Sequence, residues 1–267
     1  MNGFQTFIGV EDFKTVEILR NLFGEFLGTF LYVFVGVMST VSLSKSLITS
    51  VIPVAFAFGL SLSTVSHVVQ RASGAHLNPA ISISCLVVGE IKFLKCLCYM
   101  LVQCCGASSG ALSVVIIASR QSLDEEDGVS HPLFVGVWAA LVVEICITFL
   151  MVIVFKAMND PTRNDLNLSG PLVVGLSVAS GHLVGYLLSS SSMNPARSFG
   201  PALVNLDFKY HWIYWIGPIL GGVLGAIYYA FGMQDREALK PLDRLDSPLT
   251  SAFMEYIAFC LDLVFAN

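Results

Sequence analysis

Two stretches of the chain, SGAHLNPAIS at residues 73–82 and SSSMNPARSF at residues 190–199, carry the same tripeptide. In both, Asn is followed by Pro and Ala. Asn is among the preferred N-cap residues of a helix, and Pro is favoured at the first helical position. The stretches therefore predict two helix starts, one at Asn78-Pro79 and one at Asn194-Pro195.

The composition indicates a membrane protein. Of 267 residues, 55% are hydrophobic and only 12% are charged, whereas a soluble domain usually has about 25% charged residues. The net charge of −5 gives no reason to expect nucleic acid as a partner. No cleavable signal peptide is evident in the first residues. The cysteines show neither a disulfide framework nor metal-ligand spacing, so we expect no metal and no cofactor.

Six segments are long and apolar enough to cross a membrane, for which about 20 residues are needed. They are Leu22–Leu43, Ser50–Val69, Phe93–Ser119, Pro132–Phe155, Pro171–Leu188 and His211–Gly232. Two shorter apolar runs, Pro79–Val88 and Pro195–Leu206, begin at the Asn-Pro pairs. Each would form about 15 Å of helix, half the thickness of a bilayer core. The sequence thus predicts an all-α membrane protein with six transmembrane helices and two re-entrant half-helices.

The two halves of the chain repeat each other. Glu25-x-x-x-Thr29-Phe30-Leu31 returns 119 residues later at Glu144. Gly59-Leu60-Ser61 returns 116 residues later at Gly175, the same spacing that separates the two Asn-Pro-Ala triplets. Each half holds three spans, an odd number, so the second half must be inverted relative to the first. Inverted repeats with broken helices place a functional site at the membrane midplane.

Basic residues predict the orientation of the chain in the membrane. If both termini are cytoplasmic, only Lys45, Arg120 and Lys209 lie outside. Ten basic residues then lie inside: Lys14, Arg20, Arg71, Lys92, Lys95, Lys156, Arg163, Arg236, Lys240 and Arg244. We therefore expect cytoplasmic termini, in a multi-pass protein of the plasma membrane.

The chain resembles the aquaporins, the major intrinsic protein family, from about Asn21 to Gly232. The motifs that carry the resemblance are Ser73-Gly74-Ala75-His76-Leu77-Asn78-Pro79-Ala80 and Met193-Asn194-Pro195-Ala196-Arg197-Ser198-Phe199-Gly200-Pro201. One Asn-Pro-Ala would be weak evidence, whereas two copies at the same place in each half of a six-span repeat are strong evidence. The family implies a passive channel, usually a homotetramer with four pores.

On this interpretation the chain divides into three parts. Residues 1–21 would form a cytoplasmic N-terminal segment, and residues 22–232 the channel domain, with repeat one at about 22–119 and repeat two at about 132–232. Residues 233–267 would form a cytoplasmic tail. Apolar residues recur at helical spacing in Phe253–Val264, which favours an amphipathic helix that lies on the membrane or on the protein.

The place where the two half-helices meet has an electrostatic consequence. Each helix N-terminus carries about half a positive charge, so the two together repel cations, including hydronium. The side-chain amides of the two Asn residues still offer donors to a passing water oxygen. We expect this part of the pore to interrupt proton relay and to be formed by Asn78, Pro79, Ala80, Asn194, Pro195 and Ala196.

The resemblance also implies a second constriction, toward the outer face, which is formed by Phe58, His182, Ser191 and Arg197. Arg and His are expensive at membrane depth and indicate a functional site there. The charge of Arg197, directly after a half-helix start, adds to the helix dipole, which suits the exclusion of cations. Without the resemblance, Phe58 would be interpreted as a residue that packs against lipid or core.

Glu25 and Glu144 occupy matching positions in the first and fourth spans. One interpretation is a proton relay. The other, which the family implies, is a pair of buried carboxylates that accept backbone N–H bonds from the two half-helix loops. We favour the second interpretation and expect both residues to brace the loops.

The family contains strict water channels and wider glycerol conductors. Glycerol conductors typically carry Asp directly after Asn-Pro-Ala-Arg, where this chain has Ser198. They often carry a basic residue at the position of Ala202, and they usually replace the fifth-span His, whereas His182 is retained here. At the position of Ser191, many animal water channels have a cysteine instead. These residues favour a narrow, water-selective pore.

We therefore predict a passive water channel that excludes protons and ions, with water as permeant and the lipid bilayer as surroundings. No metal cluster, nucleophile–base pair or phosphate loop suggests an enzyme. Two alternatives stay open. One is a channel for another small neutral solute, such as hydrogen peroxide, ammonia, urea or glycerol. The other is a membrane junction or scaffold protein with a nearly closed pore.

Overall fold

A computed structural model describes residues 7–14, 16–41, 47–118, 128–163 and 169–234, and these residues contain helices but no strands. The amphipathic helix expected in Phe253–Val264 lies outside the described residues. The helices are η1 (Val10–Lys14), α2 (Val16–Val41), α3 (Leu47–Ser73), α4 (Pro79–Val87), α5 (Phe93–Ala118), α6 (Val137–Met158), α7 (Gly170–Ser189), α8 (Pro195–Asn205), α9 (Ile213–Tyr228) and η3 (Tyr229–Met233).

The six expected spans and two half-helices are all present, with small shifts at their ends. The first span begins at Val16, six residues before the expected Leu22. Its first turns carry Glu17 and Arg20, charges that a hydropathy argument leaves out of a membrane span. The sixth span begins at Ile213 rather than His211, after a short turn.

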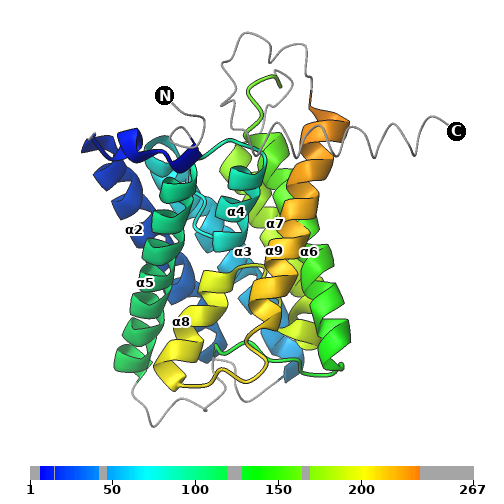
Figure 1. Ribbon diagram of the computed structural model, residues 1–267. Helices are drawn as coiled ribbons and strands as arrows, with labels where there is room; N and C mark the ends of the chain where they lie inside the picture. The colour runs from blue at the N-terminus through cyan, green and yellow to red at the C-terminus, as the bar shows by residue number, and fades with distance from the viewer. Residues whose placement is uncertain (1–6, 15, 42–46, 119–127, 164–168, 235–267) are drawn as a thin grey trace, which may run out of the picture.

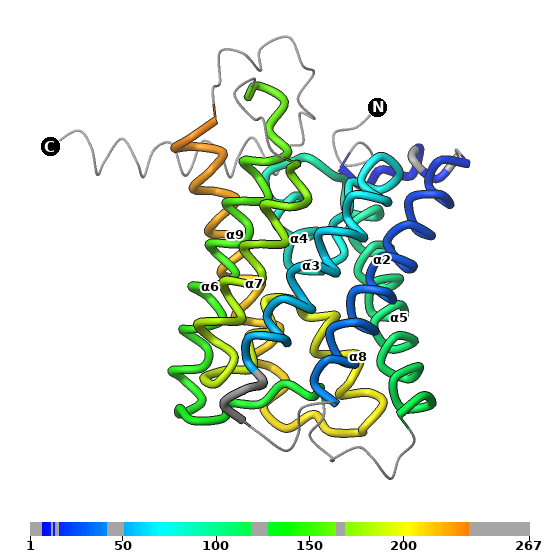
Figure 2. The backbone as a smooth tube through the Cα atoms, turned by 180° about the vertical axis from the view of Figure 1, so that it is seen from behind, coloured from blue at the N-terminus to red at the C-terminus, as the bar shows by residue number. Residues whose placement is uncertain are grey.

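The six long helices stand side by side as a bundle, and the two half-helices lie within it at different heights (Figure 1). Helix α2 begins and α9 ends at the same end of the bundle, which we call the terminal face; the other end is the opposite face. Helix α4 occupies the half of the bundle nearer the terminal face, and α8 the half nearer the opposite face, in both views (Figure 2). The repeat is therefore inverted, as expected.

The packing follows the repeat. Helix α2 packs along α5, and its counterpart α6 packs along α9. The two half-helices cross over between the repeats, because α4 packs on α9 and α8 packs on α5. Each half-helix is thus held by the third span of the other repeat, which brings the two Asn-Pro starts to the middle of one bundle.

Gly59 and Gly175, the repeated glycines of the sequence, lie where α3 crosses α7. A Cβ on Gly59 would collide with the backbone carbonyl of Gly175, and a Cβ on Gly175 would collide with the carbonyl of Gly59. Any side chain here would separate the two helices. The glycine pair therefore sets the close approach of the two repeats along the wall that carries Phe58 and His182.

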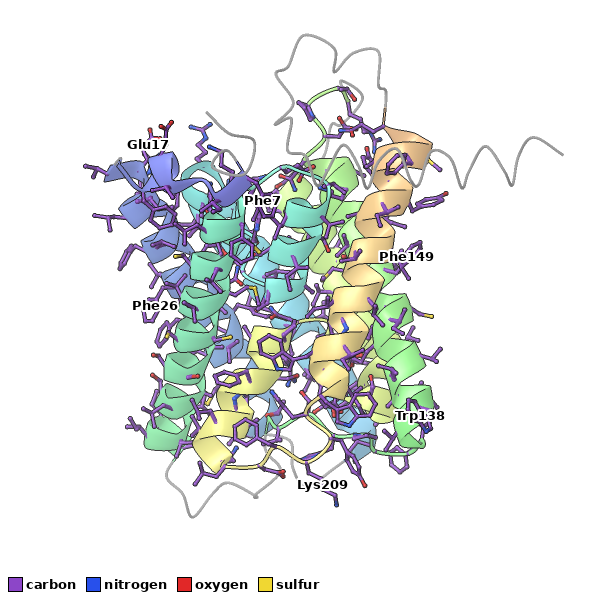
Figure 3. The ribbon with its side chains drawn as sticks, viewed as in Figure 1. Phe7, Glu17, Phe26, Trp138, Phe149 and Lys209 are labelled. Atoms are coloured by element: carbon purple, nitrogen blue, oxygen red, sulfur yellow. The ribbon has the colours of Figure 1, made fainter. Side chains whose placement is uncertain are left out.

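The outer surface of the bundle is apolar. Large hydrophobic side chains such as Ile116, Val142 and Val184 are more than half exposed. Figure 3 shows Phe26 and Phe149 on opposite flanks of the bundle. Trp138, which is 73% exposed, contacts Trp212 near the opposite face with ring centroids 5.8 Å apart, where a belt of aromatic residues meets the edge of a bilayer. This surface suits lipid.

Candidate functional site

Asn78 and Asn194 cap the two half-helices. Both have extended backbone conformations, and both are followed by Pro at the first helical position. The Oδ1 atom of Asn78 accepts a hydrogen bond from the N–H of Ala80 at 2.8 Å. The Oδ1 atom of Asn194 accepts from the N–H of Ala196 at 2.9 Å. The sequence argument for two helix starts therefore agrees with the local geometry.

The same two side chains join the half-helix loops to each other. The Nδ2 atom of Asn78 donates to the carbonyl of Met193 at 2.8 Å, and the Nδ2 atom of Asn194 donates to the carbonyl of Leu77 at 2.8 Å. A side-chain amide has two N–H donors. One donor of each Asn is therefore used to lock the loops, and the other remains for a molecule in the pore.

The loops before the two Asn residues have a strained backbone. Ala75 and Leu77 have φ values of 52° and 53°, and their counterparts Ser191 and Met193 have values of 45° and 51°. Left-handed conformations of this kind cost about 1–3 kcal/mol each for residues other than glycine, and they persist only where the surroundings impose them. The strain turns successive backbone N–H groups toward one buried acceptor in each loop.

That acceptor is a glutamate. The two oxygens of Glu25 accept from the N–H groups of His76 and Leu77 at 2.9 and 2.6 Å. The two oxygens of Glu144 accept from the N–H groups of Ser192 and Met193, both at 2.8 Å. Both carboxylates are fully buried. The structure thus places each glutamate where a brace needs it, against the loop of its own repeat.

Gln103 on α5 was not anticipated from the sequence. Its buried Nε2 atom donates to Glu25 at 2.7 Å and to the hydroxyl of Ser82 at 3.1 Å. It therefore ties the brace to the half-helix α4. Its position could have indicated this role, because a polar side chain in the middle of the span Phe93–Ala118 needs a hydrogen-bond partner in the membrane.

The four residues expected at the second constriction come together from three parts of the chain. Phe58 and His182 stack with ring centroids 4.6 Å apart. The guanidinium of Arg197 lies 4.5 Å from the centroid of the Phe58 ring. Ser191 lies on the loop beside them, and its hydroxyl donates to the carbonyl of Gly181 at 2.7 Å. All four side chains are at most 1% exposed.

Arg197 is held by the segment that precedes α6, which carries no binding motif. Its Nη1 atom donates to the carbonyl of Gly128 at 3.0 Å and to the hydroxyl of Ser130 at 2.9 Å. Ser130 also bonds the hydroxyl of Ser198 at 2.7 Å. No local pattern marks Gly128 or Ser130 as binding residues, because their role exists only after the segment before α6 folds onto α8.

Two buried nitrogens at this constriction have no hydrogen-bond partner in the described part of the chain: Nε2 of His182 and Nε of Arg197. The Nδ1 atom of His182 lies 2.9 Å from the carbonyl of Val178. A carbonyl can only accept, so Nδ1 carries the proton and Nε2 of the neutral ring is an acceptor. The unpaired nitrogens are thus one acceptor, Nε2 of His182, and one donor, Nε of Arg197.

The arrangement of the site points to passage rather than to chemistry. Within the ranges that the structure describes, no group of three His, Cys, Asp or Glu residues could hold a metal ion. The buried polar groups belong to two half-helix starts, their braces and one constriction. Together they place a set of buried polar groups in the interior of an apolar bundle.

Comparisons with known proteins agree with this geometry. Residues 12–229 match the family model described as Major intrinsic protein. The lens fiber major intrinsic protein of Homo sapiens is 40% identical over 223 residues, with 82% of this chain and 83% of that protein covered. Aquaporin-1 of Homo sapiens is 36% identical over 239 residues, with 85% of this chain and 87% of that protein covered.

A solved structure supports the fold independently. The X-ray structure of the aquaglyceroporin from Plasmodium falciparum matches with a TM-score of 0.74 at 23% identity, and the match covers 80% of this chain and 96% of that chain. At this level of identity the match concerns the fold alone. The chain belongs to the major intrinsic protein family and is an integral, multi-pass membrane channel rather than an enzyme.

Proposed function

We propose that the protein is a passive water channel that excludes protons and ions, and that an osmotic gradient drives the flow. The single observation that carries this proposal is the reciprocal lock between Asn78 and Asn194. One amide N–H of each side chain donates to the opposite loop, and the second N–H of each remains for a molecule in the pore. A passing molecule must therefore accept hydrogen bonds at the middle of the membrane.

Acceptance of these bonds explains how water passes while protons do not. A water molecule whose oxygen accepts from both Asn residues turns its own hydrogens away from the midplane. It cannot then accept a proton from one neighbour and pass another to the next. The positive ends of the dipoles of α4 and α8 add a barrier for any cation at the same place.

The second constriction supplies the size limit. The centroid of the Phe58 ring lies 4.6 Å from that of the His182 ring and 4.5 Å from the guanidinium of Arg197. A solute the size of glycerol needs these rings to separate, whereas water needs only one donor and one acceptor. The likeness to an aquaglyceroporin does not favour glycerol for this chain, because it concerns the fold alone.

We further propose that the terminal face is cytoplasmic and that the constriction at Arg197 faces the outside, as the distribution of basic residues predicts. The exposed apolar surface suits both lipid and neighbouring copies of the chain. A homotetramer in the plasma membrane, as the family implies, is part of this proposal.

A panel of solutes tests the function. The purified protein is reconstituted in vesicles, and a jump in osmolarity is made with glycerol, urea or hydrogen peroxide. The rate of shrinkage measures water permeability, and the rate of reswelling measures entry of the added solute. We expect water permeability far above that of protein-free vesicles and glycerol permeability equal to theirs. Equal rates for water and glycerol would support a wide solute pore instead. No water flux above the lipid would support a junction or scaffold role.

A further inference from the structure

A small cavity of about 20 Å³, enough for about one water molecule, lies beside the last turns of α3 and the first turn of α7, at the terminal-face end of the bundle. His76 and Ile81 line it near the half-helix start, and Leu62, Ser66 and Gln70 follow one wall at intervals of one helical turn along α3. Asn159, directly after α6, lines it from the other repeat. Phe58, His182, Ser191 and Arg197 do not line this cavity, so it is separate from the constriction at Arg197.

One hydrogen bond connects the two walls of this cavity. The Nε2 atom of Gln70 donates to Oδ1 of Asn159 at 3.0 Å. In the described part of the chain, α3 packs mainly along α2 and α7. The bond therefore adds a link between two lining residues of the cavity that come from different repeats.

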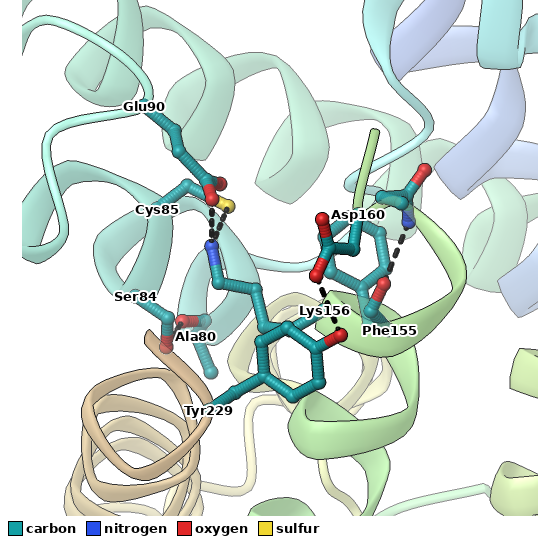
Figure 4. Close-up of polar contacts among 9 residues, drawn as sticks. Ala80, Ser84, Cys85, Glu90, Phe155, Lys156, Asp160 and Tyr229 are labelled. Atoms are coloured by element: carbon teal, nitrogen blue, oxygen red, sulfur yellow. Dashed lines mark hydrogen bonds and ion pairs between the residues drawn. The ribbon is translucent and has the colours of Figure 1, made fainter. Parts of the chain in front are cut away.

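The Asn159 half of this bond rests on a fixed support. Its Nδ2 atom donates to the carbonyl of Phe155 at 2.8 Å, so Oδ1 is the atom left to face α3. Three positions earlier on α6, Lys156 is 4% exposed and its Nζ atom lies 2.5 Å from Oε1 of Glu90 (Figure 4). From the sequence, Lys156 is one of the ten basic residues expected on the inner side, and the structure buries its side chain against the end of α4.

The residue that follows is fixed as well. A carboxylate oxygen of Asp160 accepts from the hydroxyl of Tyr229, the first residue of η3, at 2.8 Å (Figure 4). Its other oxygen accepts from the N–H of Thr162 at 2.9 Å. Burial alone would raise the pKa of Asp160, but these hydrogen bonds outweigh it and hold the pKa below its usual range. The Asp160 carboxylate therefore stays ionised at neutral pH and keeps its hydrogen bonds beside Asn159.

Gln70 is the movable half. Its long side chain projects from the last turns of α3, and a hydrogen bond with this degree of exposure has a small net value. We therefore expect the unbonded arrangement to be populated beside the bonded one. When the bond is made, two amide groups lie across the mouth; when it is broken, the Gln70 side chain can leave the path.

We propose that Gln70 and Asn159 form a further constriction of the pore, at the terminal face, whose hydrogen bond limits the rate of permeation without setting which solute passes. The inference rests on the proposed water conduction. Neither residue belongs to the Asn-Pro-Ala motifs or to the constriction at Arg197. We call the hydrogen-bonded pair of Gln70 and Asn159 the bar, because it would set the rate of flow.

The proposal is tested by measuring water permeability per reconstituted channel. Gln70→Ala and Asn159→Ala should each raise it about two- to fivefold, the factor by which one exposed hydrogen bond favours the bonded state. The double variant should rise no further than the single variants, because either change breaks the same bond. Glycerol should stay excluded in all three, since the rings of Phe58 and His182 are unchanged.

Two matched variants separate the bond from side-chain bulk. Gln70→Glu keeps the size but sets a carboxylate against Oδ1 of Asn159, so permeability should rise as in Gln70→Ala. His67→Gln changes an exposed residue of the same helix that does not line the cavity, and it should match the wild type.

The outcomes are distinct. A wild type that conducts no water would overturn the proposed function and this inference with it. A conducting wild type whose permeability is unchanged by Gln70→Ala, Asn159→Ala and Gln70→Glu would overturn the inference alone. Lower melting temperatures with unchanged flux would assign the bond a purely structural role, which also contradicts the bar.

Discussion

Asn78 and Asn194 hold each other's loops: each donates its side-chain amide, at 2.8 Å, to the backbone carbonyl of the residue that precedes the other. The two half-helices are therefore not independent elements that happen to meet. Any change that displaces one loop moves the amide of the other. The site at the midplane is one unit made from two repeats, and its supports should be coupled to its function.

The braces test this coupling. Glu144→Gln removes one of the two acceptors that face Ser192 and Met193 and leaves a buried N–H group unpaired, at a cost of about 1–3 kcal/mol. We expect a lower melting temperature in detergent and reduced water flux per folded channel. Glu17→Gln, which changes an exposed glutamate at the start of α2, is the control. Equal melting of the two variants would contradict a bracing role for Glu144.

The size limit can be removed at two residues. Phe58→Ala combined with His182→Gly takes both rings from the constriction, so glycerol should enter while water flux persists. Uptake of glycerol into vesicles measures the change, with each single variant as an intermediate. Glycerol uptake at the level of protein-free vesicles, in a double variant that still conducts water, would show that these rings do not set the limit.

Ser191 offers a chemical probe of the same place. The wild type has no thiol at this position, so mercurial reagents should inhibit it little. Ser191→Cys should create strong, thiol-reversible inhibition, because a bound mercury atom would fill an opening of about one water molecule. Strong inhibition of the wild type would point instead to Cys85, which lies on α4 and is 1% exposed.

Arg197 should act on charge more than on size. A unit charge about 8 Å from a cation repels it by about 2 kcal/mol at an effective dielectric constant of 20, or roughly thirtyfold in entry. Arg197→Val should therefore conduct water and also show a new proton or cation current under voltage clamp. The dipoles of α4 and α8 should keep that current small. A variant that conducts water without any new current would leave exclusion to the dipoles alone.

Much of the fold could be predicted from the sequence because each element carries a local signal. Asn-Pro marks a helix start wherever it occurs, and runs of about 20 apolar residues mark spans. The start of α2 was missed because Glu17 and Arg20 lie in turns that extend beyond the apolar run.

The missed site residues have a different cause. Gly128 and Ser130 bind Arg197, and Gln70 bonds Asn159, across 67 or more positions of the chain. Such contacts depend on which segments the fold brings together, and no spacing in the sequence encodes them. Gln103 was the exception, because a polar residue inside an apolar span is itself a signal.

The most direct test of the central claim is to measure water and proton permeability of the wild type in the same vesicles. Osmotic shrinkage gives the first, and a trapped pH-sensitive dye under an imposed membrane potential gives the second. The account predicts water permeability well above that of protein-free vesicles, with proton permeability equal to theirs. Proton flux that rises together with water flux would contradict it, because the Asn pair and the two half-helix dipoles would then fail to interrupt the water file.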